Sequence, residues 1–363
     1  MTRSRPRIAL TLGDVAGIGP EVVVRALADN RLRESCDPII VGHPAVVHRA
    51  MQLTGATFNL IQVQTLDDID WSSPRIPCWN PSKVAAASVP GSRIDARAGQ
   101  AAYDYLVAAT HAALRREIDA ITTAPLNKAA LHAAGLEFPG HTEILAHECG
   151  VREFAMMLYL PPGEPLRGAF GLGVAHVTLH TSIRSVPGLL SIPHIRETIQ
   201  LVDRFQKRMG CEAPRVGVCA LNPHAGEDGL FGDEESTMIA PAVEAVRQRG
   251  IDASGPIPAD ALLRRAVQGE FDGVAAMYHD QGHIALKLIG FERAVNVTLG
   301  LPIVRTSPSH GTAFDIAWSG RARAEGFIEA VLTAALLAKT NSQPESSINR
   351  DSRRSASQAS SQQ

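Results

Sequence analysis

RIALTLGDVAGIGPEVVVRALAD, residues 7–29, contains a strand, a loop and a helix in immediate succession. The apolar run over residues 7–12 predicts a short buried strand, and the glycine-rich segment GDVAGIGP predicts a loop. The segment PEVVVRALAD predicts a helix, because Pro20 suits the first helical position. A strand that leads directly into a helix is typical of α/β proteins.

The same alternation continues along most of the chain. Further strands are expected at residues 37–43, 119–125, 153–160, 173–180, 214–221 and 271–279. Further helices are expected at residues 98–116, 126–135, 191–210 and 233–250. This pattern predicts an α/β fold with a mainly parallel, doubly wound sheet flanked by helices. At 363 residues the chain is long enough for one large unit or for two lobes.

Composition argues against several kinds of partner. The 35 Lys and Arg residues nearly balance the 37 Asp and Glu residues, and aromatic residues make up only 5%. Neither nucleic acid nor an anionic membrane is therefore an expected partner. No apolar run approaches the roughly 18 residues that span a membrane. The five cysteines form no CxxC pair, which is typical of a reduced, cytoplasmic protein.

The composition changes after Lys339. Residues 341–363 are rich in Ser, Gln and Arg and contain almost no large apolar side chains. Such a segment cannot bury enough apolar surface to fold, so we expect a disordered tail.

Three predicted strands are each followed by a histidine. VAHVTLH leads to His180, VCALNPHAGEDG to His224 and VAAMYHDQG to His279. The carboxyl ends of parallel strands meet at one edge of a sheet, where α/β proteins bind ligands. Neutral imidazoles are good ligands for zinc and similar cations, and three of them leave coordination positions open for a substrate. A metal site built from these histidines is one interpretation.

The alternative interpretation is that each histidine is an isolated surface or core residue. For any one of them alone this explanation is the simpler one. Three histidines at equivalent strand ends, beside Asn222, Asp280 and glycines, leave the two interpretations equally supported. His176 lies within the strand pattern, where a hydrogen-bonded structural histidine is the expected role.

A second group of residues suits an anionic ligand. FPGHTEIL places His141 and Thr142 at a Pro-Gly turn that enters a helix, where free N–H groups favour a phosphate or carboxylate. Lys287, Asn296 and Arg305 follow one another at nine-residue intervals. Arginine can hold such an anion with two hydrogen bonds, and lysine supplies a point charge. Lys287 and Arg305 could also be surface charges, although their surroundings, IALKLIGF and LPIVRTS, are apolar.

The glycine-rich loop does not match a dinucleotide-binding fingerprint. After Gly17 and Gly19, the third glycine position of GxGxxG is occupied by Val22, and GxxxxGK[ST] does not occur. A different segment, SHGTAFDIA at residues 309–317, combines a short glycine turn with a hydroxyl and a histidine. We expect this turn to lead into a helix, where it could hold an adenine and its ribose.

At these residues the chain resembles the 4-hydroxythreonine-4-phosphate dehydrogenase family, including its D-threonate and D-erythronate 4-phosphate dehydrogenase relatives. The matching stretches are LTLGDVAGIGPEVV, TTAPLNKAAL, FPGHTEILA, LNPHAGEDGLFGDEE, GPIPADAL, MYHDQGHIALKLIGF and VNVTLGLPIVRTSPSHGTAFDIA. They follow one another in unchanged order and extend over most of the chain.

The resemblance implies a cytoplasmic homodimer of two-lobed subunits, similar to isocitrate and isopropylmalate dehydrogenases, with a cleft between the lobes. Residues 1–129 with 290–340 would form the lobe on the cofactor side. Residues 130–289 would form the lobe on the metal and dimer side. The metal ligands and most substrate contacts of one active site would come from different subunits.

The resemblance also implies roles for individual residues. One divalent cation (Zn, Mg, Mn or Co) would be bound by His180, His224 and His279. The substrate would be contacted by His141, Thr142, Lys287, Asn296 and Arg305. The adenosine of NAD or NADP would be held by His310, Gly311, Thr312, Ala313 and Asp315.

The implied reaction is oxidation and decarboxylation of 4-(phosphooxy)-L-threonine to 3-amino-2-oxopropyl phosphate, in pyridoxal phosphate biosynthesis. Lys287 or Asp260 is the candidate proton carrier. The residue after YHDQG is His283, where biosynthetic members often carry an apolar residue. DQGH is frequent in relatives that act on D-threonate or D-erythronate 4-phosphate, so their decarboxylating dehydrogenase activity is the alternative. A ring-diol branch shares DQGH but tends to lose the histidine kept here as His141.

Overall fold

The computed structural model describes residues 5–152 and 154–341, and the strands within them form one twelve-stranded sheet. In chain order the strands are β1 (Arg7–Thr11), β2 (Asp37–Val41), β3 (Leu60–Val63), β4 (Ile76–Trp79), β5 (Ala120–Thr123), β6 (Ala155–Leu160), β7 (Leu172–His176), β8 (Arg215–Cys219), β9 (Asp252–Ile257), β10 (Gly273–Ala276), β11 (Val295–Leu299) and β12 (Val304–Pro308). Their order across the sheet is β3-β4-β2-β1-β5-β12-β11-β6-β7-β10-β8-β9.

The sheet is mainly parallel, as the sequence predicts. The strands β3, β4, β2, β1, β5 and β12, in this order across the sheet, are parallel to one another. The strands β7, β10, β8 and β9 form a second parallel set. Only the central pairs β12–β11, β11–β6 and β6–β7 are antiparallel within the described sheet. Two parallel halves are thus joined through a short antiparallel centre.

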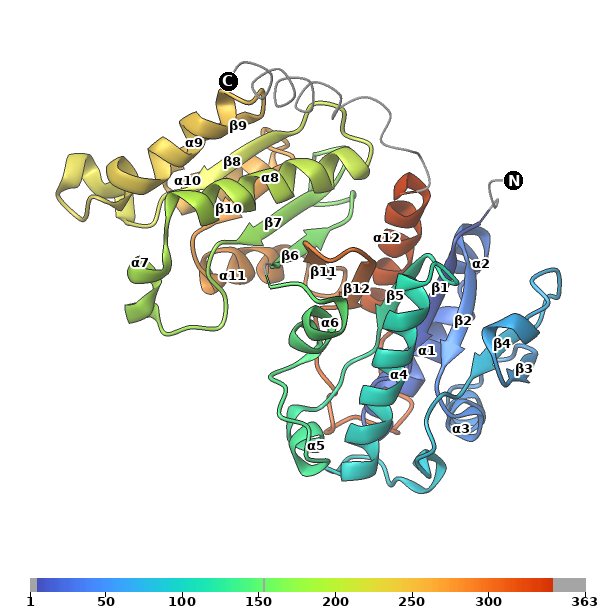
Figure 1. Ribbon diagram of the computed structural model, residues 1–363. Helices are drawn as coiled ribbons and strands as arrows, with labels where there is room; N and C mark the ends of the chain where they lie inside the picture. The colour runs from blue at the N-terminus through green and yellow to red at the C-terminus, as the bar shows by residue number, and fades with distance from the viewer. Residues whose placement is uncertain (1–4, 153, 342–363) are drawn as a thin grey trace, which may run out of the picture.

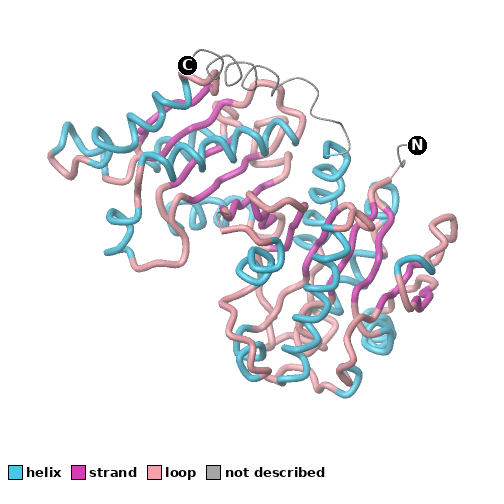
Figure 2. Tube along the Cα trace, viewed as in Figure 1, coloured by secondary structure: helices cyan, strands magenta, loops and turns pink. Residues whose placement is uncertain are grey.

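Helices cover the sheet along both halves. They are α1 (Gly19–Leu27), α2 (Asn30–Ser35), α3 (Pro44–Thr54), α4 (Ala96–Leu114), α5 (Lys128–Ala133), α6 (His141–Cys149), α7 (Val186–Leu189), α8 (Ile192–Arg208), α9 (Ala240–Arg247), α10 (Ala259–Val267), α11 (His279–Gly290) and α12 (Glu325–Asn341). Figure 1 shows α1 to α4 around β1, β2 and β5, and α8 to α10 along β7, β8 and β10. Coloured by secondary structure, the strands run through the middle of both halves with helices outside them (Figure 2).

The strands are buried because helices pack on both faces of the sheet. All four residues of β5 and all five of β12 are buried. The largest fully buried side chains include Tyr105, Tyr159 and Phe327. Full burial of a large apolar side chain contributes roughly 1.5–3 kcal/mol, so this core holds the strand ends in fixed positions.

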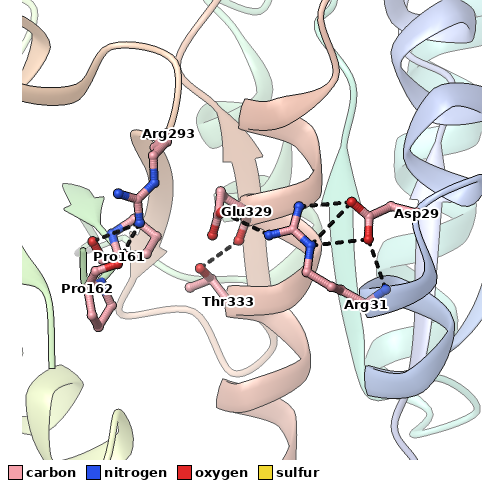
Figure 3. A network of polar contacts seen from close by, with 7 residues as sticks. All are labelled: Asp29, Arg31, Pro161, Pro162, Arg293, Glu329 and Thr333. Atoms are coloured by element: carbon pink, nitrogen blue, oxygen red, sulfur yellow. Dashed lines mark hydrogen bonds and ion pairs between the residues drawn. The ribbon is translucent and has the colours of Figure 1, made fainter. Parts of the chain in front are cut away.

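Helix α12, at the end of the described chain, contacts residues near its beginning. Arg31 is paired with Asp29 at 2.8 Å, and its Nη1 lies 3.7 Å from Glu329 Oε1 on α12. Arg293, just before β11, donates a 2.6 Å hydrogen bond to the Pro162 carbonyl oxygen after β6. Figure 3 shows both sets of contacts. They hold β11 and α12 in place beside the strands that form the candidate site.

Several local predictions are corrected by the structure. Strands β3, β4, β9, β11 and β12 were not predicted. The polar segment after β10 forms the helix α11, which was not predicted either. Residues 314–320 form turns rather than the expected helix, because Ala313 and Trp318 have φ of 43° and 57°, outside the helical region.

Two expectations concern the ends of the chain and the membrane. Of the predicted disordered tail, only Asn341 is among the described residues, and it ends α12. The remainder, residues 342–363, lies outside them. In the described part of the chain, no helix combines the length and apolar character needed to cross a membrane.

Candidate active site

A cavity of about 250 Å³ lies where β5 and β12 end and where β11 and β6 begin. β11 runs antiparallel to β12, so its first residue, Val295, pairs with Pro308 at the end of β12. β6 runs antiparallel to β11 and its Met156 pairs with Thr298, so the cavity extends from the ends of β5 and β12 across β11 to β6. The ends of parallel strands are the usual ligand position in α/β proteins. The cavity gathers seven residues predicted from the sequence: His141, Thr142, His180, Asn296, Arg305, His310 and Gly311.

Three side chains in the cavity lining have buried polar atoms with no hydrogen-bond partner within the described structure. These atoms are Asn296 Oδ1, Arg305 Nε and His310 Nε2. A buried polar atom that stays unpaired costs about 1–3 kcal/mol, so such atoms rarely occur together by chance. The lining is therefore suited to a ligand with both donor and acceptor groups.

Arg305 provides a fixed positive charge in this cavity. Its Nη2 donates to Thr123 Oγ1 at 2.7 Å and its Nη1 donates to Thr298 Oγ1 at 3.1 Å. Burial lowers the pKa of Arg305 to about 10, partly opposed by the Glu143 carboxylate, so the guanidinium remains charged at neutral pH. Each Nη keeps a second N–H, and the buried Nε has no partner in the described structure, so the guanidinium still has donors for a ligand.

Helix α6 begins at the same cavity with His141. The His141 Nε2 lies 3.2 Å from the Ala124 carbonyl oxygen, which can only accept, so Nε2 carries the proton. Burial and the Arg305 charge lower the pKa of His141 well below its usual value, and the ring is neutral. The free N–H groups at the start of α6 and the Arg305 charge together favour an anionic group.

His180 and His279 lie close together beside this cavity. His180 follows β7 and His279 starts α11 after β10, and these two strands are parallel neighbours. The ring centroids are 5.8 Å apart, and both residues line a second cavity of about 410 Å³. Burial, aided by Lys128 and His279, lowers the pKa of His180 and favours the neutral form that binds metals.

His224 lies away from this pair. Its ring packs on Phe231 with centroids 6.3 Å apart, and its Nδ1 lies 3.4 Å from a Glu227 carboxylate oxygen on an exposed segment. Among the residues that the structure describes, no three His, Cys, Asp or Glu side chains are grouped so that they could hold a metal ion. The pair His180 and His279 fits a cation, whereas the predicted set of three is not gathered in one subunit.

The two candidate proton carriers lie outside the cavity lining. Lys287 is on α11 with its Nζ 5.9 Å from the centre of the Phe291 ring. Its neighbours Ile284 and Leu288 on the same helix are 58% and 82% exposed. Asp260 is exposed in the first turn of α10. In the arrangement of one chain, neither reaches the ligand position.

The predicted cofactor segment packs against the glycine-rich loop near the N-terminus. His310 and Gly311 line the cavity, whereas Ala313 and Asp315 lie in the following turns. The Ile18 N–H donates to the Thr312 carbonyl oxygen at 3.0 Å. A Cβ on Gly17 would lie 2.9 Å from Thr312, so only glycine allows this approach.

Sequence reasoning missed several residues of the lining. Lys128 and Glu143 place a positive and a negative charge in it, and Thr123 and Ser307 add hydroxyl groups. Lys128 and Glu143 stand inside the quoted motifs TTAPLNKAAL and FPGHTEILA. Motif membership was the available signal, but it does not distinguish a charge that faces a ligand from one that faces water.

The fold is that of an α/β enzyme, and the lining of this cavity suits a small anionic ligand. The family model described as "Pyridoxal phosphate biosynthetic protein PdxA" matches residues 34–334, and the chain belongs to this family.

The relatives of the chain carry two names. The chain is 43% identical to the 4-hydroxythreonine-4-phosphate dehydrogenase of Geobacter metallireducens, over 93% of this chain and 97% of the relative. It is 45% identical to the D-threonate 4-phosphate dehydrogenase of Cupriavidus necator, over 92% and 97%. A solved 4-hydroxythreonine-4-phosphate dehydrogenase from Klebsiella pneumoniae is 40% identical, with a TM-score of 0.81, over 93% of this chain and 99% of that one. All three are named dehydrogenases.

Proposed function

We propose that this protein oxidises and decarboxylates 4-(phosphooxy)-L-threonine to 3-amino-2-oxopropyl phosphate, with NAD or NADP as hydride acceptor. The observation that carries this proposal is the buried Arg305 guanidinium, with an unpaired Nε, beside the start of α6. This combination suits a phosphate or carboxylate, and the substrate has one of each. The names of the relatives support the same substrate class.

The cavity residues bind and orient the substrate. His141, Thr142, Asn296 and Arg305 all line it and supply donors of mostly fixed direction. The unpaired Asn296 Oδ1 can accept a hydrogen bond from a substrate ammonium or hydroxyl group. Holding the reacting carbon in one orientation lowers the entropic part of the barrier.

The chemistry has two steps. The substrate C3–H bond breaks with hydride transfer to the dinucleotide while the C3 hydroxyl loses its proton, and a β-keto acid forms. The C1–C2 bond then breaks, carbon dioxide leaves, and the electron pair remains as an enolate that is protonated at C2. A divalent cation would supply Lewis-acid stabilisation of the negative oxygen in both steps. Lys287 or Asp260 carries the proton.

The metal site would use His180, His279 and His224. The first two lie close to each other in one chain, with ring centroids 5.8 Å apart. His224 begins a run of positive φ that continues through Asp228, a conformation that L-residues rarely adopt. His224 therefore requires a rearranged loop or a second subunit. Imidazole ligands favour zinc or cobalt, and open positions also admit magnesium or manganese.

The dinucleotide would lie against the turn segment after β12. Its adenosine would be held by His310, Gly311, Thr312, Ala313 and Asp315. The unpaired, buried His310 Nε2 offers a hydrogen bond there, and burial lowers the pKa of His310 so that the ring is neutral. The absence of a Rossmann fingerprint is consistent with this different segment.

We further propose a cytoplasmic homodimer whose subunits share the active site. Helix α11 exposes Ile284, Leu288 and Phe291 next to Lys287, and a partner that covers this surface would also receive the lysine. Residues 1–129 with 290–340 and residues 130–289 would form the two lobes, since β12 pairs with β5 and α12 packs on both. The described cysteines are all free, as expected in the cytoplasm.

A second candidate function is the decarboxylating dehydrogenase of D-threonate or D-erythronate 4-phosphate. His283 and the 45% identity to the Cupriavidus necator relative favour it. These substrates carry a hydroxyl where 4-(phosphooxy)-L-threonine carries an amino group.

Parallel assays decide between the substrates. Each phosphorylated acid is given with NAD and with NADP, and NAD(P)H and carbon dioxide are measured before and after chelation. We expect turnover with 4-(phosphooxy)-L-threonine that chelation removes. Turnover with only a sugar-acid phosphate would select the second candidate, and no NAD(P)H with any of the three would contradict both.

A further inference from the structure

Two buried histidines lie beside the candidate metal ligands and have no role in the proposed chemistry. His283, one turn after His279 on α11, is 6% exposed, and His176, the last residue of β7, is 1% exposed. The His283 Nδ1 lies 3.1 Å from the His176 Nε2, and the His176 Nδ1 lies 3.3 Å from the Met156 carbonyl oxygen. Two polar rings at neighbouring buried positions require an explanation.

The hydrogen bonds in this pair have one consistent direction. The Met156 carbonyl oxygen can only accept, so the His176 Nδ1 carries a proton and donates to it. Two N–H groups cannot face each other in a hydrogen bond, so His176, with its proton on Nδ1, accepts at Nε2, and the His283 Nδ1 is the donor.

The pair supports the ring of His279. The rings of His283 and His279 are stacked, with centroids 3.8 Å apart and planes inclined by 12°. At the edge of the same ring, the His279 Nδ1 lies 2.6 Å from the Asp280 Oδ1. Because a carboxylate accepts, this contact places the proton on Nδ1 and leaves Nε2 of His279 as the lone-pair nitrogen.

The packing around the pair leaves little freedom. A Cβ on Gly282 would lie 2.5 Å from the His176 Nε2, so only glycine at this position allows α11 to approach β7 so closely. The backbone approach brings His283 within hydrogen-bond distance of His176 and fixes the plane on which His279 stacks. The three rings therefore form one rigid unit.

We propose that His283 is a positioning residue, which holds the His279 ring by stacking and is itself anchored through His176 to the Met156 carbonyl. In this arrangement His279 presents a lone pair at Nε2, in a fixed direction, for a divalent cation beside His180. The inference rests on the proposed function, because it assigns His279 to that cation. Groups that orient a metal ligand commonly change metal affinity 10- to 100-fold when they are replaced.

The test uses three leucine variants of the full-length protein: His283→Leu, His176→Leu and the double variant. Each single variant leaves one buried imidazole nitrogen without its partner, whereas the double variant removes both partners. The exposed His48 on α3 provides the control variant His48→Leu. Thermal unfolding reports stability, and Co²⁺ titration followed by visible absorption reports affinity and ligand geometry. Spectra of ¹⁵N-histidine-labelled, metal-free protein report the tautomer of His279.

We expect His283→Leu to weaken Co²⁺ binding by roughly 10- to 100-fold. Without the stacked ring, His279 leaves the plane in which its Nδ1 meets Asp280, so His279 should become a mixture of tautomers. The double variant should regain part of the stability lost in the single variants, because no buried imidazole nitrogen is left unpaired, but not the Co²⁺ affinity. If His283 had only a structural role, the double variant would regain both the stability and the Co²⁺ affinity. Unchanged affinity and an unchanged His279 tautomer in His283→Leu would overturn the inference. If the wild type bound no Co²⁺, the proposed metal site would fail, while the metal-free spectra would still decide whether His283 positions His279.

Discussion

Arg305 combines a buried charge with fixed hydrogen-bond directions, and Arg305→Lys separates the two properties. Lysine keeps the charge, but its N–H groups all lie on one nitrogen and cannot reproduce the planar spread of donors by which Arg305 contacts Thr123 and Thr298 and faces the cavity. We expect KM for the phosphorylated substrate to rise about 10- to 100-fold, the effect of one charged hydrogen bond, with a smaller change in kcat. Steady-state kinetics measures both.

The matched control is Arg293→Lys. Arg293 also donates to backbone carbonyl groups, those of Pro161 and Pro162, but it lies outside the cavity lining. Its KM should stay close to that of the wild type. Equal effects of the two substitutions would mean that Arg305 acts through stability rather than through the ligand.

Asp14, in the glycine-rich loop, makes stability depend on pH. Burial raises its pKa from 3.8 to about 6, and its Oδ2 has no partner in the described structure. The folded state therefore binds the proton more tightly than the unfolded state, so the free energy of unfolding falls as pH rises from about 4 to about 6. At 1.36 kcal/mol per pKa unit, this loss is about 3 kcal/mol.

The substitution Asp14→Asn removes the titrating group while keeping the acceptor for the Ala16 N–H. Urea unfolding of both proteins between pH 4 and pH 7.5 gives the difference in their unfolding free energies. We expect the asparagine variant to gain about 3 kcal/mol relative to the wild type across that range. Parallel pH profiles would show that Asp14 titrates alike in the folded and unfolded states.

At the scale of elements, the short helix α5 depends on its cap. Asn127 accepts a 3.0 Å hydrogen bond from the Ala130 N–H through Oδ1, and the first residue of the helix, Lys128, lines the cavity. We expect Asn127→Ala to lower the free energy of unfolding by about 1 kcal/mol. Chemical denaturation measures this change. Asn59→Ala, at an exposed position before β3, should leave stability unchanged, and a loss of the same size there would contradict the capping role.

The elements that the sequence predicts well are those with a strong local signal. β1 and α1 lie where the apolar run and Pro20 place them. β9 is interrupted by Gly255 and Pro256, and β11 and β12 lack regular alternation, so local patterning does not identify them. Their strand conformation depends on pairing with β8, β6 and β5, which are distant in sequence.

The candidate site likewise contains parts that the sequence indicates and parts that depend on distant contacts. His141, Asn296 and Arg305, which the sequence groups as suited to an anionic ligand, line one cavity. Of the three histidines that follow strands, His180 and His279 lie close together, whereas His224 lies apart on a segment with a run of positive φ after β8. Backbone conformation within a loop depends on its tertiary contacts, and the sequence motif alone does not specify it.

At the scale of the whole molecule, a single chain does not bring all the predicted site residues into one cavity. Lys287 is a predicted substrate contact, yet it lies on α11 among exposed apolar side chains and not in the cavity lining. Closed dimers bury self-complementary surfaces of this kind. If α11 faces a partner, Lys287 would enter the partner's cavity, whereas His141 and Arg305 serve the cavity of their own chain.

This arrangement predicts complementation between inactive subunits. His141→Ala and Lys287→Ala should each be inactive, but subunits unfolded and refolded together should regain about a quarter of wild-type activity, since half of random dimers are mixed and each has one intact site. The pair His141→Ala and Arg305→Ala provides the control, because two residues of one chain's cavity cannot be complemented. Activity assays on both mixtures, with the dimer fraction measured by sedimentation, decide the question. Equal failure of the two mixtures, with dimers present, would exclude a shared site.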